Sequence, residues 1–454
     1  MLHSSKSKSL LILAIQRRWE SEGKVSSSMI ESSNVIKNER GFYGWIALAG
    51  AMLVYSTTSG AFFYSYGVFL PAMCSQYGWS RALVGGGLSV ALLAFGLPSP
   101  LVAATITRFG PRANIVFGNL VVVVGLAGMS IATEIWEVYL FFGIIVGLGC
   151  AFGLYLTCTT VINNWFVKKR SLGMGLIMSA GGLGGFLFPP LVTWLISNFG
   201  LQMAWLALAI IQLTCAVLIG GLILVRNKPE DMGQLPDGIY NAHANEIEET
   251  AGNRSRIYQS SMDWQPSQAI RKPTTWLITI MCAANFLAIG MVSAHQVAYL
   301  NDIGFSPLVA AMALGLIPGM SIVGRLGFGF LGVKFEVRHL AIASFIMQVT
   351  ALIILLTTKT LLLIYIYAAL FGISYGALLV ALPTFVGAYY GRKHYAQILG
   401  LIFPLAIVAE AVGPIVAGSI NDAMGTYIPA FAIIASFSAV GLLCAILAYP
   451  PKYD

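Results

Sequence analysis

The stretch LGLIPGMSIVGRLGFGFLGVK, residues 314–334, forms an apolar helical span that carries one cation, Arg325. An Arg inside hydrocarbon costs at least ~2.5 kcal/mol by insertion scales, so it usually faces a cavity, a partner or a ligand. The alternative is that Arg325 extends its guanidinium to the membrane interface without binding anything. Small residues let a neighbouring helix approach closely, and five glycines surround the cation: Gly315, Gly319, Gly324, Gly327 and Gly329.

The composition places the whole chain in a membrane. Of its 454 residues, 57% are hydrophobic and only 10% are charged, whereas soluble proteins average about 25% charged residues. Apolar runs of about 20 residues, the length that crosses a bilayer, recur twelve times between residues 44 and 449. The sequence therefore predicts an all-α membrane protein with 12 transmembrane helices.

The basic residues are distributed by side of the membrane. Of the 26 Lys and Arg residues, only Arg81, Arg325 and Lys359 fall outside the two terminal segments, the central loop and the loops on one face of the predicted topology. Because basic loops stay in the cytosol, we expect a multi-pass protein of an inner or plasma membrane with both termini cytoplasmic. The net charge of +8 thus reflects topology and does not indicate a nucleic-acid partner.

The cysteines and the N-terminal segment add no further chemistry. Six cysteines lie inside or at the edge of spans, without a C-x-x-C pair or a His at metal-ligand spacing, so we expect no disulfide, no metal and no cofactor. The apolar run 10–15 is too short for the core of a signal peptide. We expect residues 1–40 to form a disordered cytoplasmic tail.

The second half of the chain repeats the first at a shift of about 225 residues. Tyr-Gly-Trp-Ser at 77–80 falls on Ile-Gly-Phe-Ser at 303–306, and matches follow in order: Trp165 with Tyr390, Gly175 with Gly400, Pro189 with Pro414, and Gly200 with Gly425. Such ordered matches indicate duplicated structure. Six spans in each half give parallel repeats, as in secondary transporters with a midplane site. We therefore expect a six-helix half at 41–225, a polar cytoplasmic linker at 226–273 and a second half at 274–454.

Two motifs carry a family resemblance. Residues 40–45, RGFYGW, and 165–175, WFVKKRSLGMG, resemble D-G-G-W-G-W and Y-F-x-K-R-R-x-L-A-x-G of the monocarboxylate transporter family and its oxalate/formate antiporter relatives, within the major facilitator superfamily. The resemblance covers nearly all of residues 41–450. It implies the 12-helix fold in two pseudo-repeats, with spans one, four, seven and ten lining a central route.

The resemblance also assigns roles to single residues. Arg325 matches a span-eight Arg thought to meet the substrate carboxylate. The family's Asp one turn earlier and its Lys in span one, which are assigned to proton coupling, are replaced here by Ser321 and Phe63. The superfamily's loop motif between spans two and three is degraded, since Thr107 stands in place of its acid before Arg108.

Polar side chains within the spans provide the remaining candidates. For substrate contact we select Tyr64, Tyr155, Asn285, His295 and Tyr375. For any one of them the alternative is an interhelical hydrogen bond worth about 0.6 kcal/mol, and His295 is equally a packed histidine or a proton shuttle. The basic triplet Lys168, Lys169 and Arg170, with Arg108, is assigned to gating or, alternatively, to topology alone.

Glu410 is the only other charged side chain in the middle of a span. A buried carboxylate there is either paired or protonated. The sequence therefore predicts that Glu410 carries the proton if transport is proton coupled, with Arg325 as its cation. A static ion pair between the two is the alternative.

These features favour a secondary transporter of small organic anions, foremost monocarboxylates, that works by alternating access, with proton symport left open. Antiport of mono- and dicarboxylates and export of a larger metabolite are alternatives on the same fold. A phosphate-binding G-x-x-x-x-G-K-[ST] loop is absent, which argues against a primary pump. A membrane enzyme would need clustered acids, His or Cys at the interface, and the few such residues inside the spans are far apart in sequence. A nontransporting receptor stays open, as does the oligomeric state.

Overall fold

A computed structural model describes residues 42–238, 258–260, 262–357 and 359–452. The expected tail at 1–40 lies outside these residues. Contacts divide the chain into Met1–Tyr43 and a compact unit, Gly44–Asp454. The described elements of this second unit are all helical.

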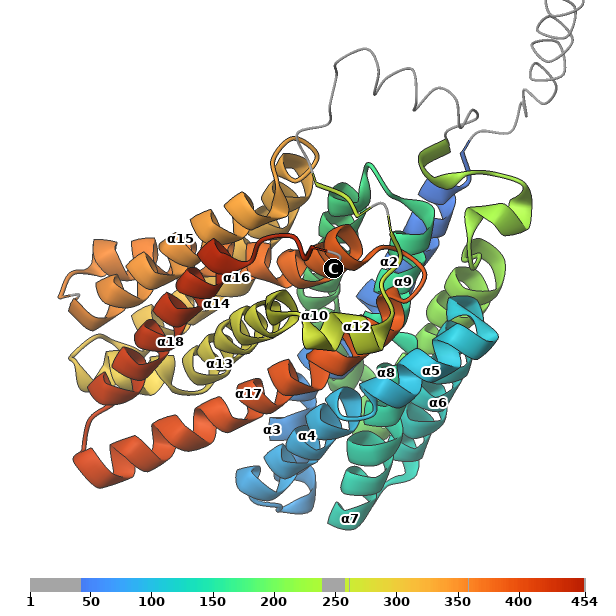
Figure 1. Ribbon diagram of the computed structural model, residues 1–454. Helices are drawn as coiled ribbons and strands as arrows, with labels where there is room; N and C mark the ends of the chain where they lie inside the picture. The colour runs from blue at the N-terminus through green and yellow to red at the C-terminus, as the bar shows by residue number, and fades with distance from the viewer. Residues whose placement is uncertain (1–41, 239–257, 261, 358, 453–454) are drawn as a thin grey trace, which may run out of the picture. The chain divides into compact units, whose positions relative to one another are not determined.

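The first half contains six crossings, most of them assembled from more than one helical segment (Figure 1). Crossing two bends by 47° between α4 and α5. Helix α10 contains crossing five and the first part of crossing six, and the π-helix η3 completes crossing six. The two crossings divide at Gly200, whose φ of 82° lies outside the helical region. The segments in order are α2 (Gly44–Ser59), η1 (Gly60–Tyr64), α3 (Tyr66–Tyr77), α4 (Arg81–Gly96), α5 (Ser99–Phe109), α6 (Pro111–Ile131), α7 (Ile135–Val138), η2 (Tyr139–Val146), α8 (Gly147–Gly153), α9 (Tyr155–Trp165), α10 (Arg170–Ile211) and η3 (Gln212–Leu224).

The second half has a simpler pattern of six continuous helices. The described parts of the linker before it hold three short helices, η4 (Pro229–Met232), η5 (Pro236–Gly238) and α12 (Pro266–Arg271). The six crossings are α13 (Pro273–Asp302), α14 (Pro307–Leu331), α15 (Val337–Thr357), α16 (Leu361–Tyr390), α17 (Tyr395–Met424) and α18 (Ile428–Leu447).

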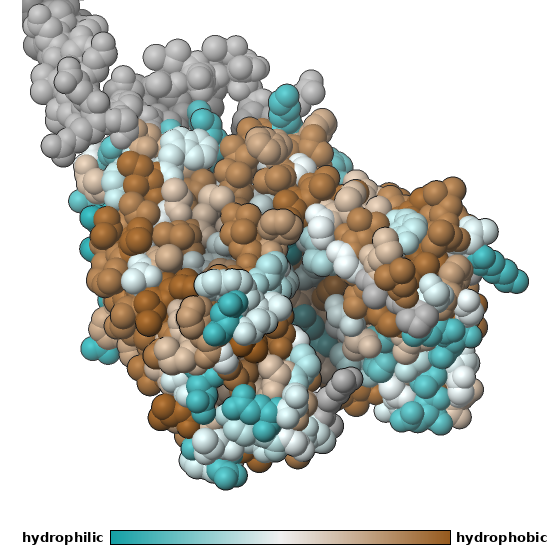
Figure 2. Space-filling model, turned by 180° about the vertical axis from the view of Figure 1, so that it is seen from behind, coloured by the Kyte–Doolittle hydropathy of each residue, from teal (hydrophilic) through white to brown (hydrophobic). Residues whose placement is uncertain are grey.

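The number of crossings agrees with the prediction. Among the described residues, ten helices are long and apolar enough to span a membrane, and the bent pair α4 and α5 makes an eleventh. One of the ten, Arg170–Leu224, is 55 residues long and divides at Gly200 into two spans, which gives twelve. Hydrophobic side chains cover much of the surface in Figure 2, as lipid contact requires. The predicted 12-helix membrane fold is confirmed.

Each half has its own buried core. In the first half, Gln212 Nε2 donates to Thr58 Oγ1 (2.8 Å) and to Asn119 Oδ1 (2.7 Å), which joins crossings six, one and three. In the second half, Tyr367 donates to Gln296 Oε1 at 2.8 Å inside an apolar cluster drawn from its helices. Each of these glutamines bonds through one amide atom to a group inside the protein, because lipid offers no hydrogen-bond partners.

The two halves touch at one end of the helices. We call this the basic end; it holds the turns around 110, 166–170, 332–336 and 391–394 and the described parts of the linker. There a Cβ on Gly175 of α10 would lie only 2.7 Å from Gly329 Cα of α14, and one on Gly400 of α17 only 2.8 Å from Ser99 O of α5. Ser171 also donates to Phe328 O at 3.2 Å. The basic end is therefore closed.

Towards the opposite end the halves separate. Along α14, Gly329 packs on Gly175 and Ile322 lies close to Gly182, but one heptad further Gly315 has no atom within 4 Å of a built Cβ. Gly319 is equally open. Five glycines of α14 were expected to let a neighbouring helix approach closely. Only Gly324 and Gly329 contact a neighbour, because the other three lie where the helices diverge or where no helix covers α14. A hollow between the halves is visible in Figure 2.

Candidate functional site

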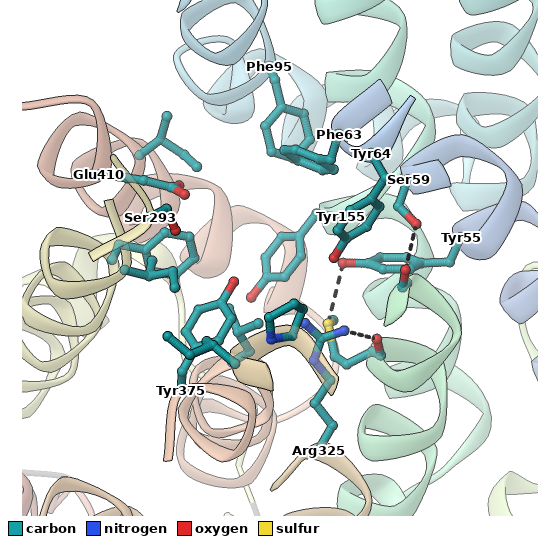
Figure 3. A pocket seen from close by; sticks show the side chains of 18 of the residues that line it. Tyr55, Ser59, Phe63, Tyr64, Phe95, Tyr155, Ser293, Arg325, Tyr375 and Glu410 are labelled. Atoms are coloured by element: carbon teal, nitrogen blue, oxygen red, sulfur yellow. Dashed lines mark hydrogen bonds between the residues drawn. The ribbon is translucent and has the colours of Figure 1, made fainter. Parts of the chain in front are cut away.

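A cavity of about 460 Å³ lies between the two halves, beyond the closed basic end (Figure 3). Crossings one, two, four and five of the first half and seven, eight, ten and eleven of the second half provide its walls. All four spans expected to line a central route therefore do so. The polar or charged lining residues are Tyr55, Ser59, Tyr64, Tyr155, Ser293, Arg325, Tyr375 and Glu410.

Helical spacing explains which side chains reach the cavity. On α17 the lining residues are Phe403, Ile407 and Glu410, and on α14 they include Leu314, Pro318 and Arg325. Residues three, four, seven or eleven apart share one face of an α-helix. One stripe of each crossing thus faces the cavity, and both charges of the site lie on such stripes.

The tyrosines of crossing one are accommodated by glycines of α10. A Cβ on Gly181 would lie 2.8 Å from the Tyr55 ring, and one on Gly185 would lie 2.9 Å from the Tyr64 ring. Between these tyrosines the helix widens into the π-helix η1, where Ser65 N donates to Gly60 O at 2.9 Å. Such π-bulges occur frequently at functional sites. Here the bulge sets the direction of Tyr64.

Arg325 is held inside the protein and does not extend to the membrane interface. Its side chain is 5% exposed, and its Nη1 donates to Met178 O of the other half at 2.7 Å. Its Nε has no hydrogen-bond partner among the described residues. The buried hydroxyl of Tyr155 lacks one too, and the Tyr155 ring stacks on Phe403 at 4.4 Å between centroids. The guanidinium is anchored at one nitrogen and retains donors for a ligand.

Glu410 enters the cavity from a different wall. Figure 3 shows it on the opposite side from Arg325, with Tyr375 and Tyr155 between them. No ion pair joins the two charges in the described part of the chain, and Arg325 bonds to Met178 O instead. The expected pairing of Glu410 with Arg325 is therefore not formed in this conformation, because α14 and α17 bring their charges to separate walls.

Two of the expected contact residues lie elsewhere. His295 packs between helices, with Nε2 2.9 Å from Pro414 O and Nδ1 3.3 Å from the Tyr427 hydroxyl. Asn285 is buried beside a separate void of only about 10 Å³. The cavity stripe of α13 is instead Phe286, Ile289 and Ser293. Successive residues of an α-helix are rotated by about 100° about its axis, so a residue next to a cavity-lining position, such as Asn285 beside Phe286, faces a neighbouring helix.

The basic triplet and its companions lie at the basic end. Arg170 is 5% exposed, and its side chain packs against Gly387 of the second half. Lys169 Nζ lies over the Trp45 ring at 5.6 Å, and Arg108 lies over its neighbour Phe109 at 5.2 Å. Thr107 accepts from Gln397 Nε2 at 3.4 Å. Arg170 and Thr107 thus contact the other half, while the ring contacts of Lys169 and Arg108 stay within their own half.

The two positions where coupling residues were expected differ in their surroundings. Phe63 lines the cavity and packs edge-on against Phe95 at 5.7 Å between ring centroids. Ser321 is fully buried and donates to Pro318 O at 2.7 Å, one turn earlier on its own helix. Neither can carry a charge, so Arg325 and Glu410 are the only charged side chains of the described cavity wall.

Sequence reasoning did not identify the aromatic part of the wall. Phe95, Phe286 and Phe403 all line the cavity, and Phe403 packs edge-on against both of the others, at 5.6 and 6.2 Å. The sequence alone does not distinguish these positions, because a Phe in a membrane protein suits lipid as well as a cavity. The signal that could have identified two of them is spacing: Phe286 precedes Ser293, and Phe403 precedes Glu410, by seven residues, which places each pair on one face of its helix.

Twelve crossings in two repeated halves, closed at one end over a central cavity, define a polytopic membrane protein of the transporter type. The model of the Major Facilitator Superfamily matches residues 48–335 and 320–454, and the chain belongs to this superfamily. It is a transporter related to the monocarboxylate transporters. Rat monocarboxylate transporter 13 is 25% identical over 420 residues, 88% of each chain. Rat monocarboxylate transporter 12 is 24% identical over 412 residues, 86% of this chain and 82% of the relative.

Solved structures share the fold. The transporter FucP in its outward conformation matches with a TM-score of 0.66 at 14% identity, covering 89% of this chain and all of FucP. The human organic anion transporter MFSD10 matches with a TM-score of 0.62 at 16% identity, covering 89% of this chain and 99% of the other. At these identities the likeness supports the fold alone.

Proposed function

We propose that this chain is a secondary transporter of small organic anions, foremost monocarboxylates, that works by alternating access. The observation that carries the proposal is Arg325, a buried guanidinium in the cavity wall with a nitrogen left unpartnered among the described residues. A guanidinium binds a carboxylate through two parallel hydrogen bonds. Tyr64, Tyr155 and Tyr375 line the same cavity and complete the proposed anion site.

The proposed cycle moves the two halves about this site. With the basic end in the cytosol, as the distribution of Lys and Arg favours, the closed basic end makes this conformation open to the outside. A bound anion adds one negative charge to the cavity, and protonation of Glu410 removes one. Glu410 is therefore the proposed proton carrier in a symport cycle, and exchange of anions is the same cycle without proton release.

Uptake into proteoliposomes tests the proposal. We expect short monocarboxylates to accumulate when the outside is more acidic than the inside. Arg325→Ala should reduce uptake at subsaturating substrate, and Glu410→Gln should abolish accumulation while preserving exchange of labelled for unlabelled anion. Absence of any carboxylate flux in the parent protein would refute transport and favour a receptor. Exchange without pH-driven accumulation in the parent would instead assign the chain to antiport.

A further inference from the structure

Glu410 is a charge in a membrane span that the rest of the protein does not neutralise. No ion pair to it is formed within the described residues, and the other charge of the cavity, Arg325, lies on the opposite wall (Figure 3). A carboxylate at this depth needs a proton or a cation. Apart from Arg325, the titratable groups that face it across or beside the cavity are neutral side chains: Cys282, Tyr375, Tyr155, Tyr64 and Tyr55.

The space between the two charges suits a cationic group on the ligand. Phe286 and Phe403 line the same cavity as Glu410, and the rings of Tyr155 and Tyr375 separate Glu410 from Arg325. Aromatic faces attract ammonium and guanidinium groups. The cavity of about 460 Å³ is within the range of roughly 300–1,000 Å³ typical of sites for drug-sized ligands. A carboxylate of a few atoms bound at Arg325 would leave the Glu410 wall empty.

Resting on the proposed anchor at Arg325, we infer that the preferred substrates are carboxylates with a distal cationic group, with the carboxylate on Arg325 and the cation on Glu410. The charges then balance. A simple carboxylate neutralises Arg325 and requires a proton on Glu410, whereas an aminocarboxylate neutralises both residues by itself. Uptake of simple carboxylates should therefore depend on a proton gradient, and uptake of aminocarboxylates should not.

A matched set of ligands tests this inference. We would measure binding of straight-chain carboxylates of three to seven carbons, with and without a terminal amino group, to purified protein by calorimetry. A charge-assisted hydrogen bond contributes about 1.5–3 kcal/mol, so the amino group of the best-fitting length should tighten binding by roughly 10- to 150-fold. Glu410→Gln should remove this gain and leave simple carboxylates bound. Asp422→Asn, on the same helix but outside the cavity lining, is the matched control.

The outcomes separate this inference from the proposed function. If simple carboxylates bind through Arg325 but the amino group adds nothing at any length, the inference is overturned and the anchor stands. The same holds if Glu410→Gln weakens both ligand series equally. If no carboxylate binds, or if Arg325→Ala binds all of them like the parent, the proposed function itself fails.

A second inference comes from the linker, whose described parts are docked at the basic end. Asp237 accepts hydrogen bonds from the backbone N–H groups of Val167 (2.8 Å) and Lys168 (2.6 Å). Asp263 accepts from those of Arg392 (2.7 Å) and Lys393 (2.9 Å). These turns are equivalent, since a shift of 225 residues places Val167 on Arg392 and Lys168 on Lys393. Each end of the linker thus caps the corresponding turn of its own half.

Each end of the linker also reaches across to the other half. Glu230, seven residues before Asp237, forms a bidentate pair with Arg392 of the second half, at 2.7 and 2.9 Å. Gln259, four residues before Asp263, donates from Nε2 to Val167 O of the first half at 2.9 Å. Both crossing contacts must break before the two halves can separate at this end.

We propose that the linker is a latch that holds the basic end closed through these two crossing contacts. Spin labels placed on either side of the basic end would report its opening as a distance. In Glu230→Ala/Gln259→Ala we expect the open population to rise several-fold over the parent. Asp231→Ala is the control, because the ion pair that Asp231 forms among the described residues lies within the linker, with Lys228 at 3.8 Å.

Charge reversal keeps the test independent of folding. Glu230→Arg combined with Arg392→Glu should restore the parent distances that Glu230→Arg alone disturbs. Equal open populations in the double alanine variant, the control and the parent would overturn the latch. So would a failure of the reversed pair to restore the closed end in a folded protein.

Discussion

Gly175 offers a sharp test of the alternating-access geometry, because it lies at a close backbone-to-backbone contact between the halves. A Cβ at this position would lie 2.7 Å from both Arg325 O and Gly329 Cα, which are backbone atoms that cannot rotate away. Carbon atoms pack at about 3.5–4.0 Å, so Gly175→Ala requires the two helices to move apart by roughly 0.8 Å. Overpacking of this kind costs about 1–3 kcal/mol, and only the conformation with a closed basic end bears this cost.

The expected result is a shift of population towards the conformation that opens at the basic end. A cost of about 1–3 kcal/mol corresponds to a change of roughly 5- to 150-fold in the ratio of the two conformations. Spin labels at positions 136 and 424, where Trp136 and Met424 are 59% and 65% exposed at the opposite end, should move closer together. The protein for labelling would first be freed of its six cysteines.

A glycine on the partner helix provides the control. Gly327 of α14 has no atom within 4 Å of a built Cβ, so Gly327→Ala adds the same methyl group without touching the other half. The reasoning is refuted if Gly175→Ala and Gly327→Ala give the same distance distribution in folded protein.

Three further predictions follow from other parts of the fold. Gly315→Trp should hold the protein open at the end away from the linker, because Gly315 continues the α14 contact ridge into open space; label distances there should stay long even with substrate. Burial alone would raise the pKa of Glu230, but the hydrogen bonds from Arg392, a backbone hydrogen bond and the charges of Arg392 and Lys228 together outweigh it and lower the pKa. The pair should thus persist as the pH falls through the usual carboxyl range and break only below it, so basic-end opening should depend on acid pH in the parent and not in Glu230→Gln. Gln212→Leu removes two buried hydrogen bonds, one of them to Asn119, and should lower stability by about 1 kcal/mol at roughly 0.6 kcal/mol per bond, measured as a lower thermal unfolding midpoint.

The sequence was sufficient for the parts of this protein that membrane energetics determine. Twelve apolar runs predict twelve crossings because backbone polar groups in lipid must bond within helices. Arg325 could be selected because a cation in such a run is too costly to have no function or partner. The matches between the two halves of the sequence occur in the same order, and they predicted a duplicated structure. Duplicated helices keep glycines and prolines at the same places because they pack in the same way.

The sequence did not determine which face of a helix meets the cavity. His295 and Asn285 are polar residues of α13, yet Phe286 and Ser293 line the site, because the packing of neighbouring helices decides the rotation of the helix. The sequence also did not predict that the linker docks at the basic end. Asp237 and Asp263 act as single carboxylates on backbone N–H groups, and such contacts leave no pattern in a polar segment.

The central claim is that Arg325 binds the substrate carboxylate, and direct binding tests it without transport. Calorimetric titration of purified protein with a short monocarboxylate should show binding in the parent. Binding should be weaker in Arg325→Lys, which keeps the charge but loses the bidentate geometry. In Arg325→Ala the affinity should fall by about 10- to 150-fold, as expected for the loss of about 1.5–3 kcal/mol of charge-assisted hydrogen bonding. Equal affinity in all three folded proteins would contradict the claim.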